Sequence, residues 1–375
     1  MVDSTPGGNR KVVIVHDWLT GMRGGEKVLE SICRIFPSAD LLTLVANRQS
    51  VSPLITSRRI RPSMVQLLPN ATRWYRQYLP VFPFAIEQFD LDDVDLVIST
   101  SHCAAKAVVP TGRARHLCYC HSPMRYAWDQ FDAYFGPERL GKWQSAVARR
   151  VMARIARWDR DTANRVDEFL ANSHHVAGRI ARYYNRRAKV LHPPVDTAFF
   201  TPNGAPPASD FLVVSALVPY KRLEVVVDAA TVLGVPLTIV GTGPDESRLR
   251  SRAGSTVKFL GAVDAAALRE LYRRSGAVLL PGEEDFGIVP VEAMACGRPV
   301  IALGRGGATE TVVPGVTGVL VPPDQPGGFA DAMAHFDSAS YDPKAIRAHA
   351  EQFGTDRFEQ SFRASVNDLI GTAAC

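Results

Sequence analysis

The stretch Pro281-Gly-Glu-Glu-Asp-Phe-Gly-Ile-Val-Pro-Val-Glu-Ala-Met-Ala-Cys-Gly297 decides the fold of the second half of the chain. It follows an apolar run, Gly276–Leu280, that predicts a buried strand ending at the Pro281-Gly282 turn. Pro290 is typical of a first helical position, and Gly297 is typical of a helix end. The stretch therefore predicts a strand, an acidic loop, a short helix and then a second strand over Pro299–Ala302.

Two features give this stretch chemical content. The free backbone N–H groups of Gly287–Val291 can face an anion such as a phosphate. Glu284 and Glu292 stand before and after that segment, where their carboxylates can accept hydrogen bonds from sugar hydroxyls. Taken alone, the two glutamates favour a surface loop with charged residues and an ordinary helix cap. In an open α/β sheet, however, ligands bind beside strand ends and helix N-termini.

Composition and length limit the class of protein. The chain has 375 residues, a length that predicts two domains. Of these residues 46% are hydrophobic and 22% are charged, which is usual for a globular protein. No apolar run reaches transmembrane length, and Met1–Arg10 is polar without a signal-peptide core, so we expect a cytoplasmic protein. The net charge of +5 is a mild excess, and since nucleic-acid binding would rest on it alone, we expect no nucleic-acid partner.

The cysteines and histidines predict neither disulfides nor a metal site. The six cysteines show no paired spacing, which suits a reducing compartment. Cys118-Tyr-Cys-His121 lacks a second ligand cluster, so we read the two thiols as strand-end residues. We expect no metal and no cofactor.

Strands alternate with helices along the whole chain. Strands are predicted over Lys11–Val15, Leu41–Val45, Val94–Ile98, His116–Cys120, Glu168–Ser173, Lys189–Leu191, Phe211–Ala216, Leu237–Val240 and Val257–Leu260. Helices are predicted from Glu26, over Arg139–Arg165, over Leu223–Leu233 and through the tail from Asp342 to Leu369. This alternation predicts an α/β fold of two Rossmann-like parallel-sheet domains facing across a cleft. A Pro/Gly-rich connector places the domains at 1–200 and 201–350, with a final helical segment, 351–375, crossing back to the first.

Several strand-end loops carry candidate ligand groups. Gly24-Gly25 lies between the first strand and a helix N-terminus, which is a plausible phosphate or substrate cradle, although tight turns explain most such pairs. His121 follows the Cys120 strand end, where a hydrogen-bonded structural histidine is the alternative. Lys221-Arg222 follows the strand that begins the second half.

The predicted helix over 139–165 is amphipathic and basic. Trp143, Val147, Val151, Ile155 and Trp158 recur on one face, with lysine and arginine around them. Such a helix can lie on an anionic membrane at the inner face of the cell membrane, or its apolar stripe can be core.

Together these residues resemble the retaining glycosyltransferases of family 4, which have the GT-B fold. Glu284-Asp-Phe-Gly-Ile-Val-Pro-Val-Glu292 matches that family's E-x7-E motif. Supporting segments are Gly304-Arg-Gly-Gly-Ala-Thr-Glu310, Val240-Gly-Thr-Gly-Pro244, the Lys221 loop and Pro193-Pro-Val-Asp196. His16-Asp-Trp-Leu19 and His121-Ser-Pro-Met-Arg-Tyr-Ala-Trp128 look most like bacterial mannosyltransferases of surface-polysaccharide synthesis.

The resemblance implies a role for each site residue. Lys221 and Arg222 would neutralise the donor diphosphate, Glu284 would hold the donor sugar, and Glu292 would bind the ribose. His121 would lie over the reacting centre, through its ring or its backbone carbonyl. Donor-binding contacts would come further from Gly24, Gly25, Gly261, Val263, Phe286, Gly287 and Ile288. Many relatives have an arginine where this chain has Ala216, and Arg222 is the candidate to supply that charge.

The implied reaction is transfer of mannose from GDP-mannose, with retention, to a lipid-linked or polysaccharide acceptor. Neither glutamate is expected to be a nucleophile, because an oxocarbenium-like front-face transition state is implied. Acceptor recognition would fall to loops around Arg23–Gly25 and Ser99–Lys106. The alternatives are a UDP-sugar donor and a non-catalytic nucleotide-sugar-binding partner. A nicotinamide-dependent dehydrogenase is disfavoured because no G-x-G-x-x-G follows the first strand.

Overall fold

A computed structural model of the protein describes residues 10–204, 206, 208 and 210–371, and its chain divides into two compact units. The first unit runs to Pro194 and resumes at Asp356, and the second spans Val195–Thr355. Residues 1–9 of the polar N-terminal stretch lie outside the described residues, and so does Cys375. Both units are α/β with an entirely parallel sheet, as the alternation of strands and helices predicts.

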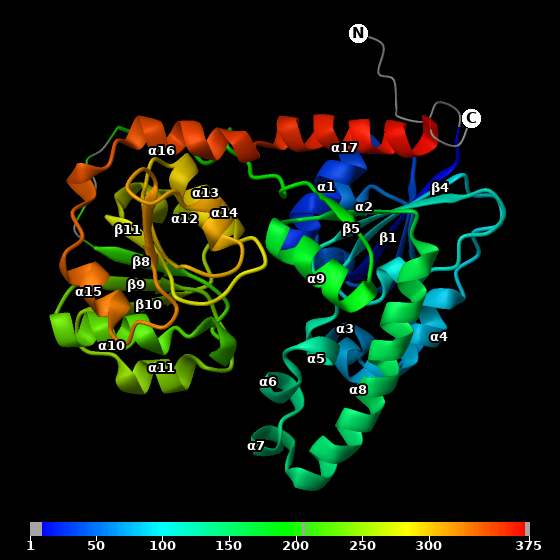
Figure 1. Ribbon diagram of the computed structural model, residues 1–375, viewed down its shortest axis with the longest axis horizontal. Coiled ribbons are helices and arrows are strands. Elements are labelled where there is room, and N and C mark those ends of the chain that lie inside the picture. The colour runs from blue at the N-terminus through cyan, green and yellow to red at the C-terminus, as the bar shows by residue number, and fades with distance from the viewer. Residues whose placement is uncertain (1–9, 205, 207, 209, 372–375) are drawn as a thin grey trace. The chain divides into compact units, whose positions relative to one another are not determined.

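The first unit contains a seven-stranded sheet in the order β3-β2-β1-β4-β5-β6-β7 (Figure 1). Its strands are β1 (Val12–Leu19), β2 (Asp40–Ala46), β3 (Ile60–Pro62), β4 (Leu96–Ser101), β5 (Arg115–Cys120), β6 (Glu168–Ala171) and β7 (Ala188–Val190). The strand order reverses between β1 and β4, whose registers pair Val12 with Leu96 and His16 with Thr100. Such a reversal leaves a crevice at the carboxyl ends of the two strands, which is where open parallel sheets bind ligands.

Helices cover both faces of this sheet. They are α1 (Gly24–Ile35), α2 (Pro53–Thr56), α3 (Ala71–Trp74), α4 (Phe82–Glu87), α5 (Arg125–Trp128), α6 (Phe131–Phe135), α7 (Pro137–Leu140), α8 (Lys142–Thr162), α9 (His174–Tyr184) and α17 (Thr355–Gly371). Short 3-10 turns are η1 (Arg48–Ser50), η2 (Met64–Leu67), η3 (Tyr75–Val81), η4 (Ala105–Ala107) and η5 (Ala163–Arg165). The alternating side chains of β1 divide the core, since Val13 and Val15 pack with α4 and α8 while Ile14 packs with α1 and α17.

The second unit contains a six-stranded sheet in the order β10-β9-β8-β11-β12-β13. Its strands are β8 (Phe211–Val214), β9 (Leu237–Val240), β10 (Val257–Gly261), β11 (Ala277–Leu280), β12 (Val300–Leu303) and β13 (Gly318–Val321). The order reverses between β8 and β11, which are paired directly through Ala277 and Phe211. The second crevice therefore lies after these two strands.

Helices also cover both faces of the second sheet. They are α10 (Glu224–Leu233), α11 (Glu246–Arg252), α12 (Ala265–Arg274), α13 (Ile288–Ala295), α14 (Ala308–Thr311), α15 (Gly328–Ala334) and α16 (Pro343–Ala350), with the turns η6 (Pro219–Lys221), η7 (Ser338–Ser340) and η8 (Glu351–Phe353). Val227 of α10 and Phe329 of α15 pack on one face, and Met294 of α13 and Ile346 of α16 pack on the other.

Two predicted helices are divided in the structure. The segment 139–165 is interrupted at Gly141, whose φ of +81° separates α7 from α8 and cannot continue a right-handed helix. The tail from 342 to 369 is also two helices, because Gly354 takes an extended conformation (φ −65°, ψ 154°) between η8 and α17. Periodicity alone does not register such single-residue breaks.

The helix after the acidic loop begins two residues earlier than predicted, at Ile288 instead of Pro290. Proline is tolerated at the third helical position because the first turn's N–H groups have no partner within the helix. The helix ends at Ala295, just before Gly297, as the sequence predicts. The sequence does not predict β3 or β13, since β3 has a single buried apolar residue, Ile60, and β13 begins at a glycine.

Candidate functional site

The crevice of the second sheet brings together Lys221 and Glu284. Lys221 ends the turn η6 that follows β8, and Glu284 lies in the acidic loop that follows β11. The Lys221 ammonium forms an ion pair with the Glu284 carboxylate, and the two side chains are only 14% and 18% exposed. The sequence places both residues at strand ends, and the reversal in strand order makes those two ends neighbours.

Arg222 lies beside this pair with a different geometry. Its backbone is left-handed (φ +54°), it follows η6 as its C-cap, and its side chain is exposed. Ala216, where the family resemblance leads us to expect an arginine, is also exposed. Both cationic side chains of the Lys221-Arg222 pair therefore start from the same loop, but only Lys221 is drawn onto the carboxylate.

The acidic loop is held by the glycines that follow β12. Gly307 N–H donates to the Glu284 carbonyl at 2.8 Å, and Glu284 pairs with Gly306 in a single β-bridge. A Cβ on Gly307 would lie 2.2 Å from the Cα of Phe286, so only glycine permits this approach. Phe286 is itself 2% exposed and packs on Phe353, with ring centroids 5.6 Å apart. Its side chain is thus core, and a ligand role would fall to its backbone.

Glu292 lies on α13 in a different environment from Glu284. It is 3% exposed, and one carboxylate oxygen accepts a hydrogen bond from the Tyr272 hydroxyl at 2.9 Å. Burial and the neighbouring Glu292 raise the pKa of Tyr272 well above its usual value, so the hydroxyl remains a donor. Tyr272, on α12, thus orients the carboxylate of Glu292. Nothing in its sequence context distinguishes it from a core tyrosine.

The other residues of this unit that are predicted to bind the donor lie along the same sheet edge. Gly287 is the N-cap of α13 and Ile288 is its first residue. Gly261 ends β10, and its carbonyl accepts from Gly241 N–H at 2.8 Å, which ties the loops after β9 and β10 together. Val263 packs against the core cluster that contains Phe286. The structure therefore gathers these backbone groups around the carboxyl ends of β9, β10 and β11.

The crevice of the first sheet contains a cluster of histidines and acids. A Cβ placed on Gly25, at the start of α1, would lie 3.6 Å from Nε2 of His121 and 3.8 Å from Cε1 of His16. Glu26 accepts from Arg23 N–H at 2.9 Å and lies 3.7 Å from Nε2 of His16. The Gly24-Gly25 turn thus lets the helix N-terminus approach both imidazoles, and the sequence-predicted pair of Gly25 and His121 meets here.

His121 is held at both backbone ends. Its N–H donates to the Ser101 carbonyl at 2.8 Å, and its carbonyl accepts from the Asn172 amide at 2.9 Å. Burial, with His102 nearby, lowers the pKa of His121 from 6.5 to about 3, so the ring is a neutral imidazole. The carbonyl, which the family resemblance implies as one possible ligand atom, already accepts one hydrogen bond, from Asn172.

Asp17, in β1, holds the loop at this crevice, a role that nothing in its sequence context indicates. Its carboxylate is fully buried and accepts from the backbone N–H groups of residues 102–105 at distances between 2.6 and 3.0 Å. Burial alone would raise the pKa of Asp17, but the charge and hydrogen bonds of His102 lower it well below its usual value. A carboxylate that stays charged here fixes the loop after β4.

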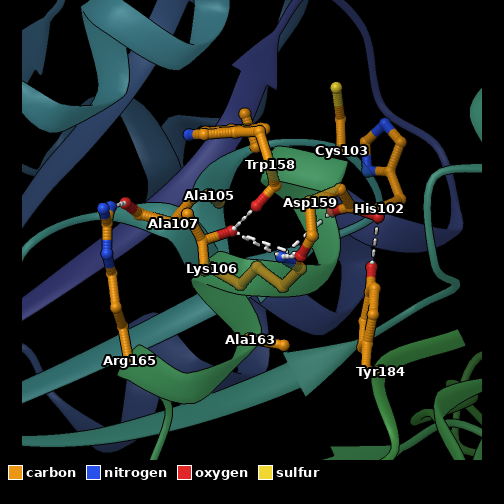
Figure 2. A network of polar contacts seen from close by, with 12 residues as sticks. His102, Cys103, Ala105, Lys106, Ala107, Trp158, Asp159, Ala163, Arg165 and Tyr184 are labelled. Carbon is orange, nitrogen blue, oxygen red and sulfur yellow. Dashed lines mark hydrogen bonds and ion pairs between the residues drawn. The ribbon is translucent and has the colours of Figure 1, made fainter. Parts of the chain in front are cut away.

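That loop is fixed from its other end by a buried network (Figure 2). Lys106 is 1% exposed, and its ammonium contacts an Asp159 carboxylate oxygen at 3.0 Å and the Thr162 hydroxyl at 3.1 Å. Tyr184 donates to the other Asp159 oxygen at 2.9 Å, and Trp128 donates to the same oxygen at 2.8 Å. The network ties the loop after β4 to α8, α9 and the segment after His121.

The basic helix α8 is core at one end and exposed at the other. Ile155 is buried, and Trp158 packs against the core that contains Val13 and Val15. Trp143, in contrast, is 81% exposed and Val147 is 46% exposed. Figure 1 shows α8 extending away from the sheet with α6 and α7 beside its first turns. No helix within the described part of the chain is both long and apolar enough to cross a membrane.

Comparison with known families agrees with this architecture. Residues 22–199 match the model described as Glycosyltransferase Family 4, and residues 208–336 match that of Glycosyl transferases group 1. The chain is of the family 4 glycosyltransferase type. Among curated proteins it is 30% identical over 222 residues to the D-inositol 3-phosphate glycosyltransferase of Mycolicibacterium vanbaalenii, covering 50% of this chain and 49% of that protein. The chain thus spans about half the length of that curated relative.

Solved structures establish the fold of this family 4 chain. Anabaena HepE in complex with UDP-glucose is 19% identical, with a TM-score of 0.69 over 95% of this chain and 99% of HepE. Sucrose-phosphate synthase from Thermosynechococcus elongatus is 18% identical, with a TM-score of 0.71 over 97% of this chain and 100% of that one. The expectation of a GT-B fold, two parallel-sheet α/β domains, is confirmed.

Proposed function

We propose that the protein is a retaining glycosyltransferase that takes its sugar from a nucleoside diphosphate sugar. The observation that carries the proposal is the Lys221–Glu284 ion pair at the crevice of the second sheet. A partly exposed ammonium can leave the carboxylate for a diphosphate, and the carboxylate is then available to sugar hydroxyls. Two further groups add positive potential near this pair. One is the N-terminus of α13, four residues after Glu284, and the other is the exposed Arg222, next to Lys221 in the chain.

In this proposal each residue acts on a different part of the donor. Lys221 and Arg222 stabilise the charge that develops on the leaving diphosphate, which is the usual task of cations in such sites. Glu284 positions the sugar, and Glu292, oriented by Tyr272, accepts from the ribose. Neither carboxylate is assigned the nucleophile and acid roles of a retaining hydrolase. Neutral His121, from the first unit, is proposed to act at the reacting centre, as the family resemblance implies.

For the donor we propose GDP-mannose, on the His16 and His121 segments that resemble mannosyltransferases. A UDP-sugar is the second candidate, favoured by HepE, a protein of similar fold whose structure contains UDP-glucose. The acceptor is proposed to be a lipid-linked or polysaccharide hydroxyl. A non-catalytic nucleotide-sugar-binding partner is disfavoured because His121, Lys221, Glu284 and Glu292 are all present.

The test is nucleotide release from a panel of donors. The purified protein is incubated with GDP-mannose, UDP-glucose and UDP-N-acetylglucosamine, and free nucleotide is measured with and without an acceptor extract. Release that is fastest from GDP-mannose supports the mannosyl proposal, and release only from a UDP-sugar replaces it with the second candidate. Binding without release in any mixture would support the non-catalytic alternative.

We further propose that the exposed end of α8 contacts anionic membrane surface, as a peripheral site at the inner face of the membrane. Trp143 and Val147 offer apolar contact, and lysine and arginine surround them on the helix. Flotation with vesicles of phosphatidylglycerol and phosphatidylcholine tests this contact, with Trp143→Ser as the variant. The control is Trp74→Ser, because Trp74 is a second exposed tryptophan, 41% exposed, outside α8. Loss of flotation only in Trp143→Ser supports the contact, and no flotation of the wild type excludes it.

A further inference from the structure

Tyr272 and Glu292 form a buried hydrogen-bonded pair inside the second unit. The Tyr272 hydroxyl donates to Oε2 of Glu292 at 2.9 Å, and the two residues are 0% and 3% exposed. A phenylalanine ring would fill nearly the same volume, so packing alone does not account for the hydroxyl. The contact with Glu292 does, because a buried carboxylate requires a hydrogen-bond donor.

The position of the hydroxyl is set by the core around it. The Tyr272 ring packs edge-on against Phe200, with centroids 5.7 Å apart and planes at 70°. The Tyr272 carbonyl accepts from the Ser275 hydroxyl at 3.0 Å and from the Ser275 N–H at 3.2 Å, at the end of α12. A tyrosine fixed through both its ring and its backbone presents its hydroxyl at one place. Burial and the neighbouring Glu292 raise the pKa of Tyr272, so the hydroxyl keeps its proton.

Glu292 lies on the first part of α13, next to the crevice of the second sheet. It is the fifth residue of α13, which begins at Ile288 after the Glu284 loop. The Cα–Cβ bonds of a helix tilt toward its N-terminus, so the carboxylate lies nearer the crevice than its own backbone does. A carboxylate only accepts hydrogen bonds, and the 2′- and 3′-hydroxyls of a ribose are two adjacent donors.

The carboxylate needs a fixed orientation to meet two adjacent hydroxyls together. The last side-chain torsion of a glutamate is broad, so its carboxylate can turn when nothing holds it. The Tyr272 hydrogen bond to Oε2 fixes the plane of the Glu292 carboxylate. An ionised carboxylate has about four acceptor sites, so this one bond leaves both oxygens able to accept from a ligand.

We propose that Tyr272 is a positioning residue that makes the nucleotide site select ribose over deoxyribose, a role that rests on the proposed glycosyltransferase function. With its plane set by Tyr272, the Glu292 carboxylate accepts from the 2′- and 3′-hydroxyls of the nucleoside diphosphate together. Tyr272 acts through Glu292 and does not itself contact the nucleotide. The substrate class that follows is a ribonucleoside diphosphate sugar, with its deoxy counterparts excluded.

The test compares nucleotides that differ only in the ribose hydroxyls. GDP, UDP and their 2′,3′-dideoxy analogues are titrated into the full-length protein by calorimetry, and the ratio of the two dissociation constants measures the ribose preference. The variants are Tyr272→Phe, Glu292→Ala and the double variant. Tyr341→Phe is the matched control, because it removes the hydroxyl of another tyrosine of the same unit and keeps the ring that stacks on Phe336. Thermal unfolding shows that each variant is folded.

The wild type is expected to bind the dideoxy analogue at least about tenfold more weakly than the ribonucleotide, since one hydrogen bond to a carboxylate is worth about tenfold or more. Tyr272→Phe should lower this ratio by about threefold to tenfold and leave the affinity for the dideoxy analogue unchanged. Glu292→Ala should bring the ratio near one, and adding Tyr272→Phe should change it no further. Tyr341→Phe should keep the wild-type ratio.

Four results would overturn the role of Tyr272 while the proposed function stands. One is a wild-type ratio in Tyr272→Phe. Another is an equal loss of affinity for both nucleotides in that variant, which would make Tyr272 a packing residue only. The third is an effect of Tyr272→Phe that persists in the Glu292→Ala background. The fourth is a wild type that binds both nucleotides alike, which removes the ribose contact of Glu292. A wild type that binds neither GDP nor UDP instead removes the proposed function, and the role of Tyr272 with it.

Discussion

Two lysine–carboxylate pairs, one in each unit, differ in burial and in the number of their partners. Lys106 and Asp159 are essentially unexposed, and their remaining polar atoms contact Thr162, Tyr184 and Trp128. Lys221 and Glu284 keep 14% and 18% of their side chains exposed and face a crevice in the sheet.

The comparison shows what separates a structural ion pair from one that can receive a ligand. Removing one member of a buried pair leaves an uncompensated charge, so the Lys106 pair is expected to matter for folding. The Lys221 pair is less deeply buried and has fewer partners, so it is expected to contribute less to stability than the Lys106 pair. It can therefore open for a diphosphate at small cost, and its replacement is expected to alter function and leave the fold intact.

The largest effect is expected at Glu284. Glu284→Ala should lower turnover of the nucleotide sugar by about 10³-fold, since it removes a group aimed at the transferred sugar. The melting temperature should change little. Steady-state nucleotide release and thermal unfolding measure the two quantities, and Glu283→Ala, at the exposed neighbour, is the matched control. Wild-type turnover in Glu284→Ala would contradict the proposed role of Glu284 in positioning the donor sugar.

The opposite pattern is expected at Asp159. Asp159→Asn leaves the buried Lys106 ammonium without its counter-charge and should lower the free energy of unfolding by about 3–5 kcal/mol. The measurement is urea unfolding followed by circular dichroism. Asp132→Asn is the control, because its partner Arg149 is 60% exposed and Asp132 itself is 76% exposed. Equal stabilities of the two variants would show that burial does not distinguish the pairs.

A smaller, pH-dependent effect is expected from the buried histidines of the first unit. Burial lowers the pKa of His116 from 6.5 to about 4, so the folded protein holds it neutral while the unfolded chain binds a proton below about pH 6.5. The unfolded chain therefore binds more protons than the folded protein in this range. The free energy of unfolding should decrease as the pH is lowered from 6.5 to 4. Unfolding curves at several pH values test this, and His116→Gln should flatten the dependence. An unchanged slope in that variant would assign it to other groups such as His121.

The sequence predicted the parts of the molecule that depend on local pattern. Alternating strands and helices, the acidic loop and the strand-end position of Lys221 all follow from periodicity and turn residues. The pairing of Lys221 with Glu284 required the strand order, which no local signal contains. The first half was less readable still, because Asp17 meets residues 102–105 across more than 80 positions of chain.

Burial was the second quantity that local pattern could not supply. Tyr272 and Glu292 are twenty residues apart and meet only when α12 packs beside α13. The stripe on α8 has one helical period throughout, yet Ile155 is core and Trp143 is solvent-exposed. Which part of an amphipathic helix is covered depends on where the neighbouring elements end, so the sequence left both interpretations open.

The most direct test of the central claim is the affinity of nucleoside diphosphates without a sugar, measured by calorimetry with UDP and GDP. If Lys221 leaves Glu284 to bind the diphosphate, Lys221→Met should weaken binding by about tenfold to hundredfold, the loss of one charge-assisted contact of about 1.5–3 kcal/mol. Glu284→Gln should strengthen binding, because the competing carboxylate is gone, although its turnover falls. Unchanged affinity in both variants would contradict the account.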